Sequence, residues 1–189
     1  MENKTDYDVL LAMLKKRLNE KRYYHSLCVA DEAKRLAVKY GADPEKAYLA
    51  GLLHDITKNA PDEEHLKIFK DFGIILSDVE KNAKKLWHAM SGAAYVKHIL
   101  GINDPEIIDA IRYHTTAKAD MSLLAKILYL ADFTSADRDY EDVDVIREYV
   151  DISLEKAFIY ALQYSIKDLV ELEKAVHIDT VAAYNQAVL

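Results

Sequence analysis

Apolar residues recur at helical spacing along almost the whole chain, and this periodicity limits the fold more than any other feature. In the segment from Arg22 to Tyr40, the inward positions follow the i, i+3, i+4, i+7 rule of an amphipathic helix. These positions are His25, Cys28, Val29, Glu32, Ala33 and Leu36. Only five Gly and three Pro are available for tight turns, which leaves little material for hairpins between strands. We therefore predict an all-α fold.

Capping residues indicate where several of these helices begin. Asp43-Pro44 and Asp104-Pro105 each place an N-cap residue before a proline at the first helical position. Ser77-Asp78-Val79-Glu80 is a capping box, from which we predict one helix that runs until Gly101. Residues 145–189 are predicted to form two or three further helices.

No repeat, linker or low-complexity segment divides the chain, so we expect one domain over residues 1–189. The formal net charge of −7 argues against binding to duplex nucleic acid, which needs a clustered excess of Lys and Arg. The chain has a single Cys and no apolar run near the roughly eighteen residues of a membrane span. We therefore predict a cytoplasmic location with no membrane contact.

The run from Ala50 to Lys58 is apolar until it ends in two metal-ligating residue types side by side, His54 and Asp55. Neighbours on a helix point about 100° apart, so this pair can fill adjacent coordination positions, or Asp55 can bind two metals through its two oxygens. Lys58 lies one turn after His54 if the helix continues. Its ammonium group would then hold an anionic oxygen beside the metals.

Four more ligand types lie on apolar helix faces: His25, His88, His114 and Asp132. A helical bundle can gather such side chains in its interior. Six ligands of this kind suit two octahedral metals, and imidazole with carboxylate favours iron, manganese, cobalt or nickel. We expect two divalent transition metals. Iron or manganese fits best, and iron is our prediction.

A single inward histidine is more often a hydrogen-bonded core residue than a metal ligand. We apply that interpretation, or plain surface exposure, to His65, His98 and His177, and we interpret Cys28 as a small core residue. For the six candidate ligands, the interpretation as core residues would require buried polar groups to gather without partners, which is energetically costly.

The order His, His-Asp, His, His, Asp on helices resembles the HD-domain metal-dependent phosphohydrolase superfamily, and in particular its YqeK branch of symmetrical bis(5′-nucleosyl)-tetraphosphatases. The residues that carry the resemblance are Arg22-Tyr23-Tyr24-His25-Ser26, Ala50 to Lys58, Trp87-His88-Ala89, Ile111-Arg112-Tyr113-His114-Thr115-Thr116, Leu130-Ala131-Asp132-Phe133 and Asp137-Arg138-Asp139-Tyr140. The resembling core spans residues 22 to about 147, and we expect the helices of 148–189 to pack on it.

The resemblance implies that His25, His54, Asp55 and Asp132 hold one metal. Asp55 would then bridge to a second metal held by His88 and His114, and Lys58, Arg112 and Arg138 would bind phosphate oxygens. It also implies symmetrical cleavage of diadenosine tetraphosphate to two ADP by a metal-bridging hydroxide, with Lys58 and Asp55 as catalytic residues. Ala117 stands where we expect a glycine after the two threonines, which affects the shape of that loop.

Three other functions remain open at this point: another nucleotide phosphohydrolase of the same superfamily, a di-iron oxygenase, and a non-catalytic nucleotide sensor. Lys58 and Arg112 beside the metals favour phosphate handling over dioxygen chemistry. The alternatives left open are a solvated helix-end position for Lys58 and surface salt bridges for Arg112 and Arg138. A complete ligand set gives no indication of a dead site. The expected partner is a dinucleoside polyphosphate or nucleotide, and association into a homodimer is left open.

Overall fold

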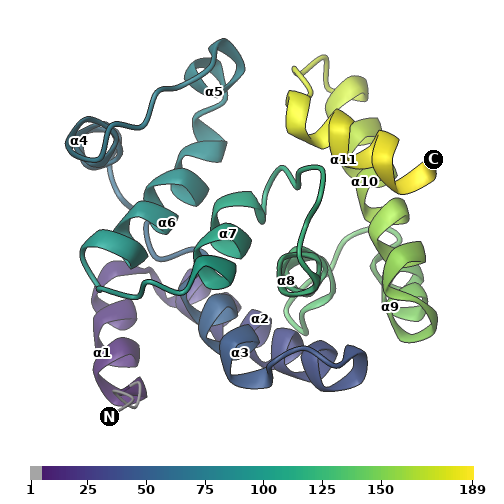
Figure 1. The fold of residues 1–189 in the computed structure, drawn as a ribbon, viewed down its shortest axis with the longest axis horizontal. Helices are drawn as coiled ribbons and strands as arrows, with labels where there is room; N and C mark the ends of the chain where they lie inside the picture. Colours follow the sequence, from purple (N-terminus) through teal and green to yellow (C-terminus); the bar gives the residue numbers. More distant parts are fainter. Residues whose placement is uncertain (1–5) are drawn as a thin grey trace.

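The computed structural model describes residues 6–189, and within them every regular element is a helix (Figure 1). This confirms the predicted all-α fold. The helices are α1 (Tyr7–Arg17), α2 (Glu20–Tyr40), α3 (Pro44–Leu53), α4 (Asp62–Asp71), α5 (Asp78–Asn82), the short 3-10 helix η1 (Lys84–Leu86), α6 (Trp87–His98), α7 (Pro105–Tyr113), α8 (Leu123–Thr134), α9 (Val143–Ile152), α10 (Leu154–Glu171) and α11 (Ile178–Val188).

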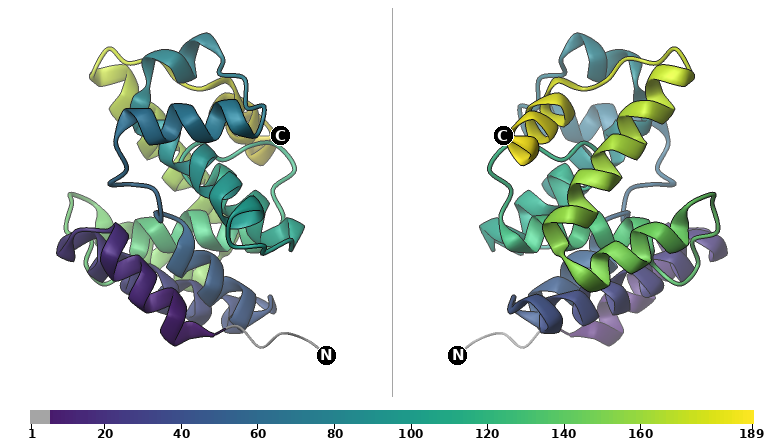
Figure 2. Two further views of the ribbon diagram at one scale, coloured as in Figure 1. Left: turned by 90° about the vertical axis from the view of Figure 1, so that its left-hand side faces the viewer. Right: turned by 90° about the vertical axis from the view of Figure 1, so that its right-hand side faces the viewer.

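Helix α8 lies in the middle of the molecule, with α2, α3, α7, α9 and α10 packed around it (Figures 1 and 2). Its sequence is apolar on nearly every side, and most of its residues are buried. Helix α2 also packs along α3, while α7 packs against α3 and α6. Of the C-terminal helices, α10 packs against α8, and α11 packs against α10. That the chain forms one domain stays a prediction.

Gly51 allows α3 to approach α2 closely. A Cβ atom at this position would lie 2.7 Å from the Cα atom of Ala30, so any larger residue would push the helices apart. His25 lies on α2 and His54 directly follows α3. The close approach of the two helices therefore brings these imidazoles together, with ring centroids 5.3 Å apart.

Helix α3 ends at Leu53 and the chain continues in turns, so the condition under which Lys58 would lie one helical turn after His54 is not met. His54 Nδ1 lies 2.6 Å from the carbonyl oxygen of Gly51. In a continuous helix that carbonyl would accept a hydrogen bond from the N–H of Asp55. The imidazole takes the place of that N–H, and the helix ends where the predicted ligands begin.

The single helix predicted from Ser77 to Gly101 is also wrong, because the chain forms α5, η1 and α6 there. The capping box that starts α5 is confirmed. Trp87 Nε1 donates to the carbonyl oxygen of Glu80 at 2.7 Å. A continuous helix would use that carbonyl to bind the N–H of Lys84, so the buried indole breaks the helix at η1.

The remaining helix signals are confirmed. Asp43 and Asp104 cap α3 and α7 with their side chains, each before a proline in the first turn. The polar segment 134–144 is largely irregular, and residues 145–189 form the rest of α9 together with α10 and α11. Among residues 6–189, no helix combines the length and apolar character needed to cross a membrane.

Candidate metal centre

All six residues predicted as metal ligands lie together where α2, α3, α6, α7 and α8 meet, and we call them the ligand cluster. They are His25, His54, Asp55, His88, His114 and Asp132. Their nitrogen and oxygen atoms form three overlapping groups of three residues, and within each group the atoms lie within 4.8 Å of one another. Five of the six residues are buried, and Asp132 is partly exposed.

His54 and His114 are oriented by the same device at the ends of α3 and α7. Each ring places Nδ1 against the carbonyl oxygen three residues earlier, at 2.6 Å from Gly51 and at 2.8 Å from Ile111. A carbonyl can only accept, so Nδ1 carries the hydrogen and Nε2 keeps a lone pair. In both residues that lone pair faces the cluster, which is the orientation of a metal-ligating imidazole.

Asp55 lies at the centre, and its two oxygens face different histidines. Oδ2 lies 3.4 Å from His54 Nε2, while Oδ1 lies 3.1 Å from His88 Nε2 and 3.7 Å from His114 Nε2. Burial opposes its ionisation, but the nearby imidazoles of His54, His114 and His88 hold the pKa of Asp55 well below its usual range. Asp55 is therefore a carboxylate at neutral pH.

Two buried atoms of the ligand cluster have no hydrogen-bond partner among residues 6–189: His54 Nε2 and Asp55 Oδ1. Leaving a buried polar atom unpaired costs about 1–3 kcal/mol, and more for a charged group. A cation that accepts both lone pairs removes that cost. The donor set therefore fits divalent metals.

His88 and His114 face each other with Nε2 atoms 3.1 Å apart. Because Nε2 of His114 carries a lone pair, this contact alone would suit a single shared hydrogen or a cation between the rings. Burial lowers the pKa of His88 to about 4, although Asp55 opposes the shift. His88 is thus neutral at physiological pH, which is the form that binds metals.

His25 and Asp132 form the other end of the cluster, with His25 Nε2 3.0 Å from Asp132 Oδ1. The opposite nitrogen, His25 Nδ1, lies 2.8 Å from Asp137 Oδ2. A carboxylate behind an imidazole fixes its orientation and raises its basicity as a ligand. The sequence interpretation gave Asp137 no role, although it lies beside Arg138 in a motif that was recognised.

Three cations surround the two carboxylates of the cluster. Arg22 Nη1 lies 2.7 Å from Asp55 Oδ2, Arg138 pairs with Asp132, and Lys58 Nζ lies 3.8 Å from Asp55 Oδ1. Each of these side chains is partly exposed. Burial lowers the pKa of Lys58, and Asp55 opposes that shift. Arg22 was not predicted as a site residue, although it lies one turn before His25 and in the same recognised motif.

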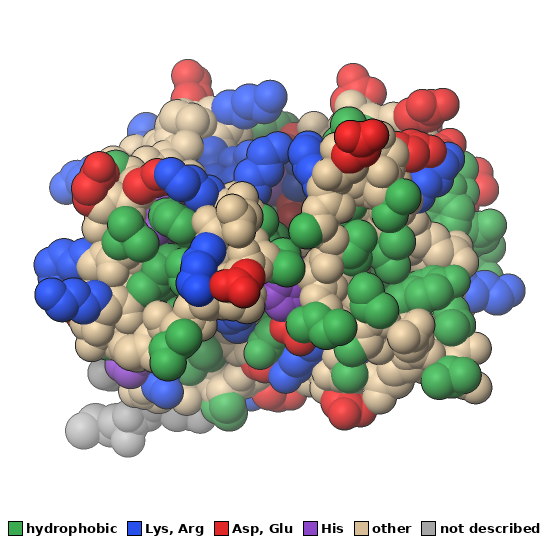
Figure 3. Space-filling view, turned by 90° about the horizontal axis from the view of Figure 1, so that it is seen from above, with side chains coloured by type: hydrophobic (Ala, Val, Ile, Leu, Met, Phe, Trp, Pro, Cys, Tyr) green, Lys and Arg blue, Asp and Glu red, His purple; other side chains and the backbone are tan. Residues whose placement is uncertain are grey.

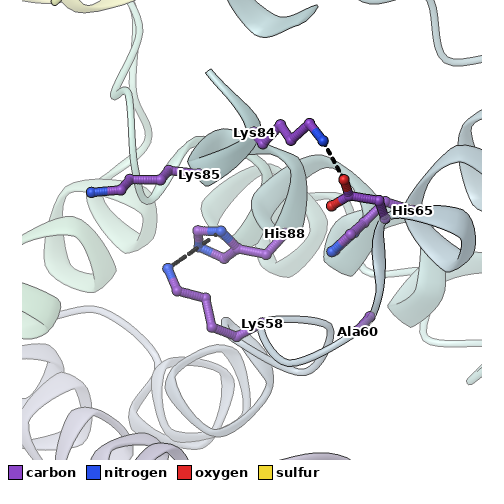
Figure 4. Close-up of a pocket in the computed structure, with 7 residues that line it drawn as sticks. Lys58, Ala60, His65, Lys84, Lys85 and His88 are labelled. Atoms are coloured by element: carbon purple, nitrogen blue, oxygen red, sulfur yellow. Dashed lines mark hydrogen bonds and ion pairs between the residues drawn. The ribbon is translucent and has the colours of Figure 1, made fainter. Parts of the chain in front are cut away.

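The cluster is open to solvent through two hollows. One of about 470 Å³ is lined by Lys58, His65, Lys84, Lys85 and His88, among others, and Figure 4 shows Lys58 reaching toward the ring of His88. Lys58 Nζ lies 3.1 Å from His88 Nε2. The second, of about 430 Å³, is lined by Lys21, Arg22, His25, Asp137, Arg138, Asp139 and Tyr140. An anionic chain could therefore approach the cluster from either end.

Arg112 lies outside the ligand cluster. Its Nη2 donates to Glu80 Oε1 at 2.9 Å, and His177 Nε2 lies 3.5 Å from the same oxygen. We call these three residues the Glu80 cluster. A phosphate role for Arg112 stays a prediction, and the guanidinium would have to share or release Glu80 to fulfil it.

The residues interpreted as core or surface groups behave accordingly. His65 Nδ1 lies 2.7 Å from Ser91 Oγ, and His98 stacks on Phe72 with ring centroids 4.3 Å apart. Cys28 is buried and has a free thiol. Ala117 adopts a left-handed backbone with φ of 55°, a conformation that favours the glycine expected there.

Comparison with known proteins gives consistent results. The family model described as "HD domain" matches residues 22–137. The symmetrical bis(5′-nucleosyl)-tetraphosphatase of Bacillus subtilis (strain 168) is 36% identical over 175 residues, covering 93% of this chain and 94% of that protein. A protein of the same name from Halalkalibacterium halodurans is 36% identical over 179 residues, covering 95% of each.

Among solved structures, an HD superfamily hydrolase from Clostridium acetobutylicum, described as involved in NAD metabolism, superposes with a TM-score of 0.94. It is 38% identical in sequence, and the match covers 97% of each chain. The likeness thus extends over the C-terminal helices as well as over the segment that the family model matches.

Proposed function

This chain belongs to the HD domain family, and on that premise we propose that it is a metal-dependent phosphoanhydride hydrolase that cuts diadenosine tetraphosphate at its centre into two ADP. The substrate and the symmetrical cut rest on relatives at 36% identity over nearly the full length, which are named symmetrical bis(5′-nucleosyl)-tetraphosphatases. The metal dependence rests on the ligand cluster.

The observation that carries the proposal is the position of Asp55 between two groups of histidines. Its Oδ2 faces His54, and its Oδ1 faces His88 and His114. This supports an assignment in which Asp55 would bridge two metals, one held with His25, His54 and Asp132 and the other with His88 and His114. Two such metals would lower the pKa of a water and polarise a phosphoryl oxygen.

The cations beside the cluster supply the rest of the chemistry. Attack on a phosphoanhydride depends mainly on in-line positioning and on neutralising charge at the non-bridging oxygens. We assign this role to Lys58 and Arg138, and we add Arg22, because all three contact the cluster carboxylates. When phosphate oxygens enter, these side chains can turn to them, since each is partly exposed.

Finer features of the proposal concern the metal and the location. We propose iron as the metal, because a mixed set of imidazole and carboxylate ligands suits it, with manganese, cobalt and nickel as competitors. We propose the cytoplasm as the location, because a free thiol such as that of Cys28 fits a reducing compartment. Elemental analysis of protein purified from its native cells, with cell fractionation, tests both.

The test of the main proposal is a product analysis at early times. Protein loaded with iron or manganese is mixed with diadenosine tetraphosphate in ¹⁸O-labelled water. The nucleotides are separated by chromatography and their masses are measured by mass spectrometry. ADP as the first product, with the label on a phosphate oxygen, is expected. ATP with AMP would refute the symmetrical cut, and binding without turnover would favour a nucleotide sensor. Oxygen consumption without cleavage of the dinucleotide would favour an oxygenase.

A further inference from the structure

A cavity of about 630 Å³ lies between η1 and the C-terminal helices, next to the ligand cluster but outside it. We call it the C-terminal cavity. Its walls include Val79, Leu86, Thr115, Leu169, His177 and Thr180, which come from α5, η1, the loop after α7, α10 and α11. The volume lies in the range of small-molecule sites, which are mostly apolar with a few placed polar groups.

One of those polar groups has no partner within the described residues. Thr115 Oγ1 is buried and makes no hydrogen bond. The neighbouring wall is already satisfied, because Thr180 Oγ1 donates to the carbonyl oxygen of Thr116 at 2.7 Å. A buried hydroxyl without a partner is costly, and a rotation of the Thr115 side chain, which lines the cavity, would let a bound ligand pair with it.

The cavity adjoins one of the two hollows that open onto the ligand cluster. Lys84 and Lys85 line both the C-terminal cavity and the hollow that contains Lys58 and His88. Thr115 directly follows the predicted ligand His114. A ligand bound to the cluster through its phosphates could therefore pass over η1 and place its other end in the cavity.

The charge of the cavity rim fits such a ligand. Lys81, Lys84, Lys85 and Lys174 line it, and none of the described residues that line it is acidic. Figure 3 shows Lys and Arg side chains gathered between the part that carries α4 and α5 and the part that carries α10 and α11. Lys84 pairs with Asp62, whereas Lys85 makes no ion pair with a residue of the described part of the chain and points away from Lys84 (Figure 4).

We propose that the C-terminal cavity binds one nucleoside of the substrate, with Lys85 on the phosphate between that nucleoside and the metals. This inference rests on the proposed function, since in a dinucleoside tetraphosphate cut at its centre one phosphate separates each nucleoside from the phosphate at the cleaved bond. The base packs on the apolar wall, and Thr115 Oγ1 pairs with a polar atom of the base or ribose. The C-terminal helices thereby acquire a role in substrate recognition.

The first test fills the cavity without touching the ligand cluster. Ala175 lines the cavity and is exposed, so Ala175→Trp blocks the nucleoside while leaving the core intact. We expect the KM for diadenosine tetraphosphate to rise about tenfold with kcat nearly unchanged, because the lost contacts serve the substrate and the transition state alike. Ala12→Trp is the matched control, since Ala12 is an exposed alanine on α1, outside the cavity. Equal KM values in the two variants would overturn the proposal.

The second test separates the cavity from the reaction. Titration calorimetry measures binding of ADP and of inorganic pyrophosphate to the metal-loaded protein. Ala175→Trp is expected to weaken ADP about tenfold and to leave pyrophosphate unchanged, whereas Lys85→Gln weakens both. ADP binding that is unchanged in Ala175→Trp contradicts the nucleoside site. The expected split in a protein that fails to cleave diadenosine tetraphosphate would refute the proposed function and support the site.

Two matched variants test the hydroxyl of Thr115. Thr115→Val removes the hydroxyl at constant shape, and Thr115→Ser keeps it. We expect a several-fold weaker affinity for ADP in the valine variant and recovery in the serine variant, with equal metal content in both. Wild-type affinity in Thr115→Val would contradict the hydrogen bond to the nucleoside.

Discussion

The ligand cluster and the Glu80 cluster both bring histidine and acidic side chains together inside the molecule, yet they differ in whether their polar atoms are partnered. In the Glu80 cluster, one oxygen of Glu80 accepts from Arg112 at 2.9 Å and the other accepts from the backbone N–H of Ser77 at 2.8 Å. In the ligand cluster, His54 Nε2 and Asp55 Oδ1 are buried and have no hydrogen-bond partner in the described part of the chain.

This difference indicates that the Glu80 cluster stabilises the fold, whereas the ligand cluster is suited to bind a ligand. A satisfied cluster holds α5, α7 and the start of α11 together and gains nothing from a cation. An unsatisfied cluster carries a desolvation cost that a metal relieves. Residue types alone do not distinguish the two, since each contains a histidine and a carboxylate.

The largest expected effect comes from removing the centre of the ligand cluster. We predict that Asp55→Ala loses both metals and that activity falls by at least about a hundredfold, because the proposed bridge disappears. His114→Ala is expected to lose mainly one metal. Elemental analysis and initial rates are the measurements, with Asp144→Ala as the control, since Asp144 is an exposed carboxylate. Two metals retained in Asp55→Ala would break the distinction between the clusters.

Lys58 and Arg112 sharpen the comparison, because both were predicted to bind phosphate and only Lys58 contacts the ligand cluster. We predict that Lys58→Ala keeps its metals and its fold but loses about 2–4 kcal/mol of transition-state stabilisation. Arg112→Ala is expected to change kcat much less and to lower the free energy of unfolding. Steady-state kinetics and urea unfolding of both variants are the measurements, and the reverse pattern would exchange the two roles.

Breaking the Glu80 cluster is expected to cost stability and no metal. Glu80→Gln keeps the acceptor for the α5 cap but loses the charge that pairs with Arg112. Loss of a fully buried pair costs several kcal/mol, and Arg112 is partly exposed, so we predict a loss of about 2 kcal/mol. Urea unfolding at pH 7 measures it, with metal content as the control. A loss of metal would show that the two clusters are coupled.

The same variant predicts a pH dependence. Burial acts to raise the pKa of Glu80, but the Ser77 backbone N–H and Arg112 outweigh it, so the folded pKa lies below the usual 4.5. A carboxyl group with a lowered pKa contributes stability above 4.5 that is lost as the pH falls through the folded value. The difference in unfolding free energy between wild type and Glu80→Gln is therefore expected to shrink between pH 7 and pH 3.

The smallest expected effect lies in the loop after His114, between the two clusters. Ala117→Gly relieves about 1–2 kcal/mol of left-handed strain at φ 55°. It also adds unfolded-state entropy and removes a buried methyl group, which together offset most of that gain. We predict a change in unfolding free energy within about 1 kcal/mol and unchanged metal content. A larger loss would show that the Ala117 methyl group packs as part of the core.

Local sequence signals predicted much of this molecule because they act over a few residues. Side chains that cap the backbone, such as Asp43 and Asp104, and the helical period of the apolar residues operate within one or two turns. They identified the all-α fold and the starts of α3, α5 and α7. They failed at η1, where the Trp87 indole binds a carbonyl oxygen that a continuous helix would use. They also left open where α3 ends, which is at the point where the His54 imidazole binds the carbonyl oxygen of Gly51.

The sequence by itself determined which residue types are offered to the interior and in which order: histidine and carboxylate on five apolar helix faces. Only the tertiary structure decided which of them meet. Arg22 and Asp137 contact residues of the ligand cluster, while Arg112 and His177 contact Glu80. The reason is that these contacts join residues about thirty to more than one hundred positions apart, and their distances depend on helix packing, including the close approach at Gly51.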